Sequence, residues 1–250
     1  MLIMVSFAAE PIIRFGFFTI TNSFLDVLLV DTAIIGIIWG FNKKASLIPG
    51  AFQNFIEMIV ETFYNLTESV AGGERTPAIF SLSLSFFIFI LFANWSGLIP
   101  GLNSVGFYRN HELVPFLRAG TSDLNVTLAL ALVSAIATHI YSLKTIGIKS
   151  YLGRYFSLNP INLYVGLLEL VSEVTKVISL SFRLFGNIFA GEIVLATIST
   201  IFAFVFPLPF LLLEIVVGFI QALVFAMLTL AFMAILSAPH QMQAKEVNHA

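Results

Sequence analysis

One apolar stretch near the C-terminal end of the chain carries an unusual number of ionisable side chains. Within positions 162–200 these are Glu169, Glu173, Lys176, Arg183 and Glu192. An ionisable group at membrane depth costs roughly 2.5–3.5 kcal/mol on insertion scales, so such groups are found mainly along ion pathways. This concentration predicts a water-filled or protein-lined path for protons or another small cation.

Helical spacing places most of these groups on one side of a helix. Positions 169, 173, 176, 183 and 187 follow one another at intervals of three, four or seven residues, which forms a single stripe that ends at Asn187. Glu192 lies nine residues past Arg183, about half a turn away around the helix axis.

A second polar pair lies on the next apolar stretch, where Glu214 and Gln221 are seven residues apart and share a face. If the two stretches pair as an antiparallel hairpin with Arg183 level with Gln221, Glu192 and Glu214 fall in nearly the same layer. That layer lies about 12 Å from Arg183 along the helix axis. The register therefore predicts one acidic region on each side of Arg183.

The two regions open in opposite directions. The outer region contains Glu192 and Glu214, with Asp123 at the start of the preceding crossing helix, and the inner region contains Glu169 and Glu173.

Arginine keeps its proton in proteins, so Arg183 can block proton transfer between these regions and hold a neighbouring carboxylate ionised. No carboxylate lies on the Arg183 stripe within one helical turn. We infer that its partner belongs to another subunit, and we expect Lys176 to pair with Glu173 or Glu169 rather than to transfer protons.

The composition predicts an all-α membrane protein around these groups. Hydrophobic residues make up 58% of the 250 residues and charged residues 10%, whereas soluble domains carry about 25% charged residues. Crossing helices need about 20 mostly apolar residues, and we expect all 250 residues to form a single membrane domain. The five predicted crossings are 23–41, 78–98, 124–143, 162–200 and 210–236, the last two forming a long tilted helix hairpin.

Two further segments connect these crossings. Positions 47–70 place apolar side chains on one side of a helix and Glu57, Glu61 and Glu68 with two asparagines on the other. This pattern favours an amphipathic helix in the membrane interface, where the glutamates avoid the lipid interior. Positions 99–123 are expected to form a polar loop.

Five crossings place most basic residues on one side of the membrane. The more basic side is predicted to be cytoplasmic, which leaves the N-terminus outside and the C-terminus inside. No transit-peptide pattern is present, so we expect a bacterial plasma membrane. The cytoplasmic group is Lys43, Lys44, Arg75, Lys144, Lys149, Arg154 and Lys245, and the outer group is Arg14, Arg109 and Arg118.

Several kinds of function are disfavoured. The chain has no cysteine and a net charge of −2, so we expect no metal site, no cofactor and no nucleic-acid partner. No phosphate-binding loop of the G-x-x-x-x-G-K-[ST] type is present. A stand-alone proton- or sodium-coupled transporter remains an alternative, although no inverted repeat is visible. An intramembrane protease is weaker, because His139 has no G-x-S-x-G partner.

Three segments carry a resemblance to a known family. SLSFRLFGNIFAGE at positions 179–192, LIPG at 98–101 and TSDLNVT at 121–127, together with Gln221, resemble subunit a of F-type ATP synthases. The resemblance covers most of the chain and is most specific around Arg183.

The resemblance implies a role for each matched residue. Arg183 would be the essential stator arginine, and Glu192, Glu214 and Gln221 would belong to the outer half-channel, although some members hold histidine at the position of Glu214. Glu169 matches a polar position of the same helix as Arg183, and Glu173 is the residue that the resemblance supports least. The supporting polar positions would be Lys176 and Asn187.

The resemblance also implies partners and a mechanism. A ring of c subunits, each with one carboxylate, would rotate past Arg183 in the lipid bilayer. Peripheral stalk b subunits and the soluble catalytic head would complete the machine. The chain would then be non-catalytic and would couple proton movement to ATP synthesis through two offset half-channels.

Some residues keep two interpretations. Asp123 is expected to be a helix N-cap, a channel residue or both. His139 is expected to make a polar contact near the inner face rather than to relay protons. Asp26 and Asp31 have no assigned role. The choice between proton and sodium, the ring size and the direction in vivo are not encoded in any of these patterns.

Overall fold

The computed structural model describes residues 10–15, 18–44, 46–99, 105–109, 112–155, 160–201 and 206–238. Within these residues five helices are long and apolar enough to cross a membrane, which confirms the predicted all-α membrane fold. They are α1 (Asn22–Lys44), α3 (Thr76–Ser96), α4 (Leu124–Ile146), α6 (Pro160–Ile201) and α7 (Pro207–Leu236). Lys245 and positions 100 and 101 of the LIPG segment lie outside the described residues.

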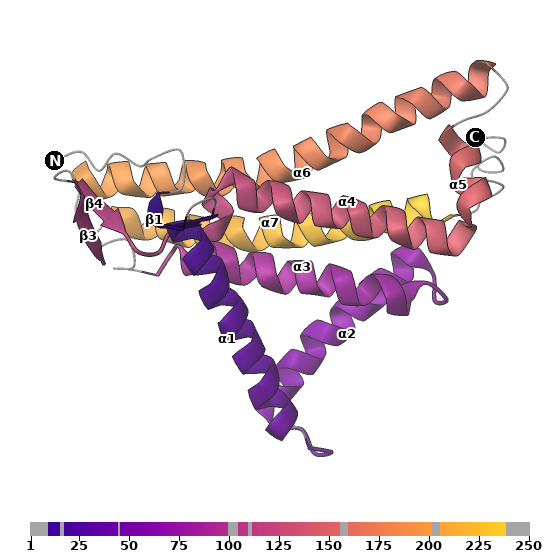
Figure 1. The fold of residues 1–250 in the computed structure, drawn as a ribbon. Coiled ribbons are helices and arrows are strands. Elements are labelled where there is room, and N and C mark those ends of the chain that lie inside the picture. The colour runs from indigo at the N-terminus through magenta and orange to yellow at the C-terminus, as the bar shows by residue number, and fades with distance from the viewer. Residues whose placement is uncertain are drawn as a thin grey trace.

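Four of these helices lie side by side as a bundle (Figure 1). α3 packs against α7, and α4 packs against both α6 and α7. α6 contains 42 residues, which at about 1.5 Å per residue is roughly twice the thickness of a hydrocarbon core. A helix of that length lies steeply inclined in a bilayer or extends beyond it.

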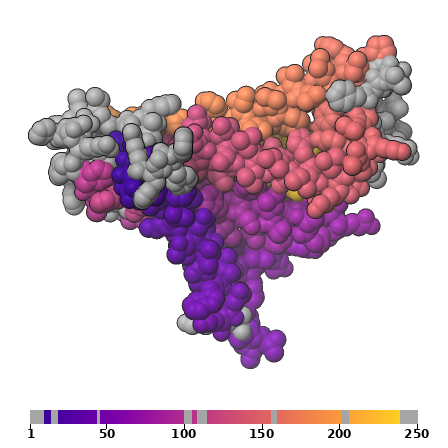
Figure 2. Space-filling view, in the orientation of Figure 1, coloured from indigo at the N-terminus to yellow at the C-terminus, as the bar shows by residue number. Residues whose placement is uncertain are grey.

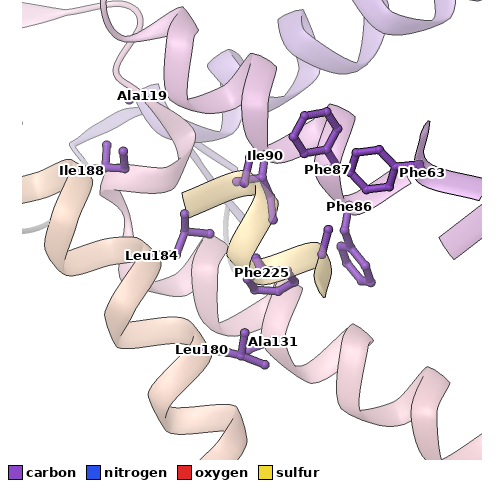
Figure 3. Packing of buried hydrophobic residues seen from close by; sticks show 12 residues of the cluster. Phe63, Phe86, Phe87, Ile90, Ala119, Ala131, Leu180, Leu184, Ile188 and Phe225 are labelled. Atoms are coloured by element: carbon purple, nitrogen blue, oxygen red, sulfur yellow. The ribbon is translucent and has the colours of Figure 1, made fainter. Parts of the chain in front are cut away.

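The bundle is held by a core of aromatic and aliphatic side chains from α3, α4, α6 and α7, with Phe63 added from α2 (Figure 3). Small residues allow close approach of the helices, as at Gly218, where an added Cβ would lie 3.2 Å from the Cβ of Asn94. Polar side chains bridge the same helices: Asn94 Nδ2 donates to the Gly218 carbonyl at 2.9 Å, and Ser83 Oγ donates to the Ala226 carbonyl at 3.1 Å.

The helix α2 (Ala51–Ala71) is not among the five apolar helices. With α1 it forms a V that projects from one side of the bundle (Figures 1 and 2). Its glutamates Glu57, Glu61 and Glu68 are exposed, whereas Phe63 and Thr67 are buried, and the helix contacts α3 and α7. Its place in the membrane interface remains a prediction.

Several short elements were not predicted. The strands β1 (Pro11–Phe15) and β2 (Phe18–Thr21) form an antiparallel hairpin, and β3 (Gly106–Arg109) and β4 (Glu112–Pro115) form another. The described part of the predicted polar loop at 99–123 therefore contains a hairpin, and it also contains the 3-10 turn η2 (Gly120–Ser122). A short helix, α5 (Ile148–Tyr155), follows α4. These elements depend on local pairing that hydrophobic periodicity does not detect.

Candidate functional site

The α6–α7 register is visible at Gly191 and Glu214. Glu214 is buried, with 6% of its surface exposed, and a Cβ at Gly191 would overlap its carboxyl group. Gly191 therefore faces Glu214 across the hairpin, in agreement with the layer predicted for Glu192 and Glu214. A residue with a side chain at position 191 would displace this carboxyl group.

A buried arginine completes this end of the hairpin. Arg118 is 5% exposed, and its Nη2 lies 3.3 Å from Glu192 Oε2. Its Nε donates to Ser122 Oγ at 3.0 Å, and its guanidinium carbon lies 5.8 Å from the centroid of the Phe189 ring. We refer to Arg118, Glu192 and Glu214 as the outer cluster, after the side predicted for it.

The position of Arg118 corrects the sequence interpretation. In the sequence analysis Arg118 served only to assign the outer side of the membrane, but the structure shows it buried and paired with a carboxylate. One signal was available: a carboxylate buried in a bundle needs a cation, and Arg118 was predicted on the side of Glu192. Only the fold of the segment before η2 brings the two together.

Two aspartates stabilise the loop that carries Arg118. Asp26 is buried on α1 and accepts hydrogen bonds from the Gly120 amide and from Ser96 Oγ, both at 2.9 Å. Asp123 caps α4 by accepting from the Asn125 amide at 2.9 Å, which confirms its N-cap role. Asp31 is exposed on α1.

Arg183 lies on the open side of α6. It is exposed and its Nη2 donates to Ser179 Oγ at 3.3 Å. Asn187, one turn further, is also exposed, and Gln221 on α7 is half-buried. Among the described residues no ion pair involves Arg183, which agrees with the inference that its partner belongs to another subunit.

Beside Arg183 is an open groove of about 450 Å³ between α6 and α7, which we call the Arg183 groove. Arg183, Lys176 and Ser179 supply its polar lining, and Leu228 and Phe232 of α7 form part of its apolar wall. A surface of this kind suits an apolar helix that carries one carboxyl group.

The acidic residues near the other end of α6 are each paired with a cation. Lys176 Nζ lies 2.7 Å from Glu173 Oε1, which confirms the expected pairing of Lys176. Arg154 of α5 lies 2.5 Å from Glu169 Oε1. Helices α4 and α5 cover this part of the stripe, so Glu169 and Glu173 are half-buried while Arg183 is exposed.

His139 and Tyr151 join this end, although the sequence analysis had not singled out Tyr151. His139 Nε2 lies 3.9 Å from Glu173 Oε2, and His139 Nδ1 lies 2.8 Å from the Tyr151 hydroxyl. We refer to His139, Tyr151, Arg154, Glu169, Glu173 and Lys176 as the inner cluster, again after the predicted side. His139 therefore makes the expected polar contact, and its partners come from α5 and α6.

The helix α5 is packed tightly against the beginning of α6. An added Cβ at Gly166 would overlap the backbone of Tyr155, and Arg154 Nη1 also donates to the Leu236 carbonyl at 3.4 Å. Burial raises the pKa of the Tyr155 hydroxyl above its ordinary value, so this residue stays neutral near the charged pairs. The packing fixes Tyr151 and Arg154 beside α6.

Comparison with known proteins gives consistent matches. Residues 24–234 match the family described as ATP synthase A chain. The chain is also similar to the protein named ATP synthase subunit a of Moorella thermoacetica, with 32% identity over 216 residues that cover 86% of this chain and 88% of that protein. The matched region includes both clusters and Arg183.

Proposed function

Since the chain belongs to the ATP synthase A chain family and is an integral membrane subunit of that machine, we propose that it provides the path by which protons reach and leave a rotating ring of c subunits. The outer cluster forms the entry half-channel, the inner cluster forms the exit half-channel, and Arg183 separates them. The chain itself catalyses no covalent chemistry.

The observation that carries this proposal is the environment of Arg183. It is an exposed guanidinium in a groove on a helix that is long and apolar enough to cross a membrane, and the described residues form no ion pair with it. A permanent cation in lipid surroundings is costly unless it is paired or wet. A ring of apolar helices with one carboxylate each supplies that pairing at every step.

The coupling follows from electrostatics. A proton that enters beside Glu192 and Glu214 neutralises a ring carboxylate, which then moves into lipid at low cost. After nearly a full turn the site meets the inner cluster and releases its proton, because the field of Arg183 favours the ionised form. Each charge that crosses 100 mV supplies about 2.3 kcal/mol.

The remaining assignments follow from this role. The peripheral stalk b subunits hold the chain against the turning ring, and the exposed surfaces of α1 and α2 are available for that contact. The soluble catalytic head is reached only through these partners. The N-terminus lies outside and the C-terminus in the cytoplasm of a bacterial plasma membrane.

Replacement of Arg183 by alanine tests the proposal. In complexes reconstituted in vesicles, Arg183→Ala should abolish ATP synthesis and ATP-driven pumping, since no group holds the ring carboxylate ionised. Passive proton flow under an imposed potential should persist or rise. Arg183→Lys should recover little, because a desolvated ammonium group can lose its proton.

The control is Lys144→Ala, which removes one exposed cation from the end of α4 and should leave ATP synthesis unchanged. An assembled Arg183→Ala complex that makes ATP at the normal proton-to-ATP ratio would rule out the gate. Vesicles that contain the chain without its ring should transport no ions, whereas a stand-alone transporter would remain active.

A further inference from the structure

A line of polar groups runs from the Arg183 groove to His139 on α4. Lys176 lines the Arg183 groove and also lines a cavity of about 10 Å³ between α4, α6 and α7, together with Glu173. A cavity of that volume is close to the smallest that holds one water molecule. Polar groups therefore continue from the groove into the bundle.

The line ends at His139, whose two ring nitrogens face different partners. Nε2 lies 3.9 Å from Glu173 Oε2, and Nδ1 lies 2.8 Å from the Tyr151 hydroxyl. The other oxygen of Glu173 lies 2.7 Å from Lys176 Nζ. The His139 side chain is 31% exposed, whereas that of Glu173 is 14% exposed. Of these two side chains, His139 is therefore the one closer to the surface of the protein.

The geometry suits transfer of a proton from Glu173 to His139. When Nδ1–H donates to the Tyr151 oxygen, the Nε2 lone pair is free to accept a proton from the Glu173 side. The 3.9 Å separation exceeds a hydrogen bond, and a small side-chain shift would bring the two atoms within hydrogen-bond distance. Imidazole is the side chain that exchanges protons most readily near neutral pH.

We propose that His139 is the proton-relay residue at the mouth of the inner half-channel, with Tyr151 as the residue that fixes its tautomer. This inference rests on the proposed function. A proton released by the ring carboxylate passes to the Glu173 carboxylate and then to His139 Nε2, which leaves Glu173 ionised beside Lys176. The imidazolium gives a proton to water and returns to the tautomer with Nδ1–H toward Tyr151.

Charges around the imidazole favour this sequence. The groups in contact with it are Glu173 from α6 and Tyr151 from α5. The neighbouring carboxylate Glu169 is paired with Arg154, whereas Glu173 lies between Lys176 and His139. Proton arrival at Glu173 weakens its attraction to Lys176, and transfer to His139 restores that pair.

The test uses the whole complex in vesicles whose soluble head faces the medium, which by the proposed orientation also places α5 on the medium side. ATP synthesis is driven by an acidic lumen. His139→Ala should lower the rate on the order of tenfold, because a positioned acid–base group is lost. A membrane-impermeant imidazole derivative added to the medium should restore most of the rate, and the same derivative enclosed in the lumen should not.

A matched pair of tyrosines separates the tautomer role from packing. Tyr151→Phe removes the hydroxyl beside His139 and should slow synthesis a few-fold. Tyr141→Phe is the same change on α4 and should leave the rate unchanged. A merely structural His139 would be recovered by His139→Gln without any response to imidazole, and that result would overturn the relay.

Failure of the relay is distinguishable from failure of the proposed function. Wild-type rates in His139→Ala, with Arg183→Ala still inactive in synthesis, would refute the relay and leave the two half-channels in place. If His139→Ala does not assemble, Tyr151→Phe decides: a rate equal to that of Tyr141→Phe overturns the inference.

Discussion

The outer and inner clusters differ in how their buried carboxyl groups are paired. In the outer cluster Glu192 is paired with Arg118, but Glu214 is buried and its Oε1 has no hydrogen-bond partner among the described residues. In the inner cluster Glu169 and Glu173 are each paired with a cation and are only half-buried. The outer cluster therefore contains a carboxyl group that still needs a proton or a water molecule, and the inner carboxylates are already neutralised.

This difference fits opposite tasks. An entry path benefits from a carboxyl group that takes up a proton from water and holds it in reach of the ring. An exit path benefits from groups that pass a proton on without keeping it, because a neighbouring cation favours the ionised carboxylate. If the comparison is sound, changes in the outer cluster should cost more stability than changes in the inner cluster, since Arg118 and Glu214 are the most deeply buried groups of the two clusters.

The largest effect is expected when the Arg118–Glu192 pair is broken. Arg118→Leu leaves Glu192 half-buried without this cation and should destabilise the fold by about 3 kcal/mol. The double variant Arg118→Leu with Glu192→Leu should recover much of that loss, because no uncompensated charge remains, yet it should still fail in proton uptake. Thermal denaturation of the assembled complexes measures the first effect and lumenal pH the second.

The Gly191–Glu214 contact should give the next largest effect. Gly191→Ala places a methyl group in the space of the Glu214 carboxyl group. The resulting overpacking should lower the free energy of unfolding by about 2 kcal/mol. Glu214→Ala in the same chain should relieve the overlap, which a double-mutant cycle detects as a coupling energy. Independent effects of the two substitutions would show that positions 191 and 214 are not in contact and would refute the register.

A smaller effect is expected in the inner cluster. Arg154→Ala removes the partner of Glu169 and a donor to the Leu236 carbonyl, but α5 lies at one end of the bundle (Figure 1), where water can solvate Glu169. Removal of these two interactions should lower the free energy of unfolding by about 1.5 kcal/mol. A loss as large as that of Arg118→Leu would contradict the contrast between the clusters. Lys149→Ala, on an exposed part of the same helix, is the matched control.

The sequence alone predicted those features of the site that lie on a single helix. Arg183, Glu192 and the Lys176–Glu173 pair follow from helical spacing, because neighbours three or four residues apart meet on a helix surface. The hairpin register was chosen because it aligned two polar pairs at once, and the Gly191–Glu214 contact agrees with it.

Contacts between separate segments were not predictable in the same way. Arg118 reaches Glu192 only because Asp26 holds the η2 turn against α1 and α3. Tyr151 and Arg154 reach the inner cluster only because α5 forms and packs on α6. No periodic pattern in a single segment contains these long-range pairings.

The smallest effect concerns Asp123, whose N-cap and channel roles can now be separated. Asparagine caps helices about as well as aspartate, whereas alanine does not. Asp123→Ala should therefore lower the free energy of unfolding by about 1 kcal/mol, and Asp123→Asn should leave it almost unchanged. Asparagine cannot carry a proton, so a channel role predicts that both variants slow proton uptake equally. If Asp123→Asn keeps both the thermal stability and the uptake rate of the unmodified complex, Asp123 acts only as the cap of α4. Proton entry would then depend on Arg118, Glu192 and Glu214 alone, and uptake would be assigned to the outer cluster without Asp123.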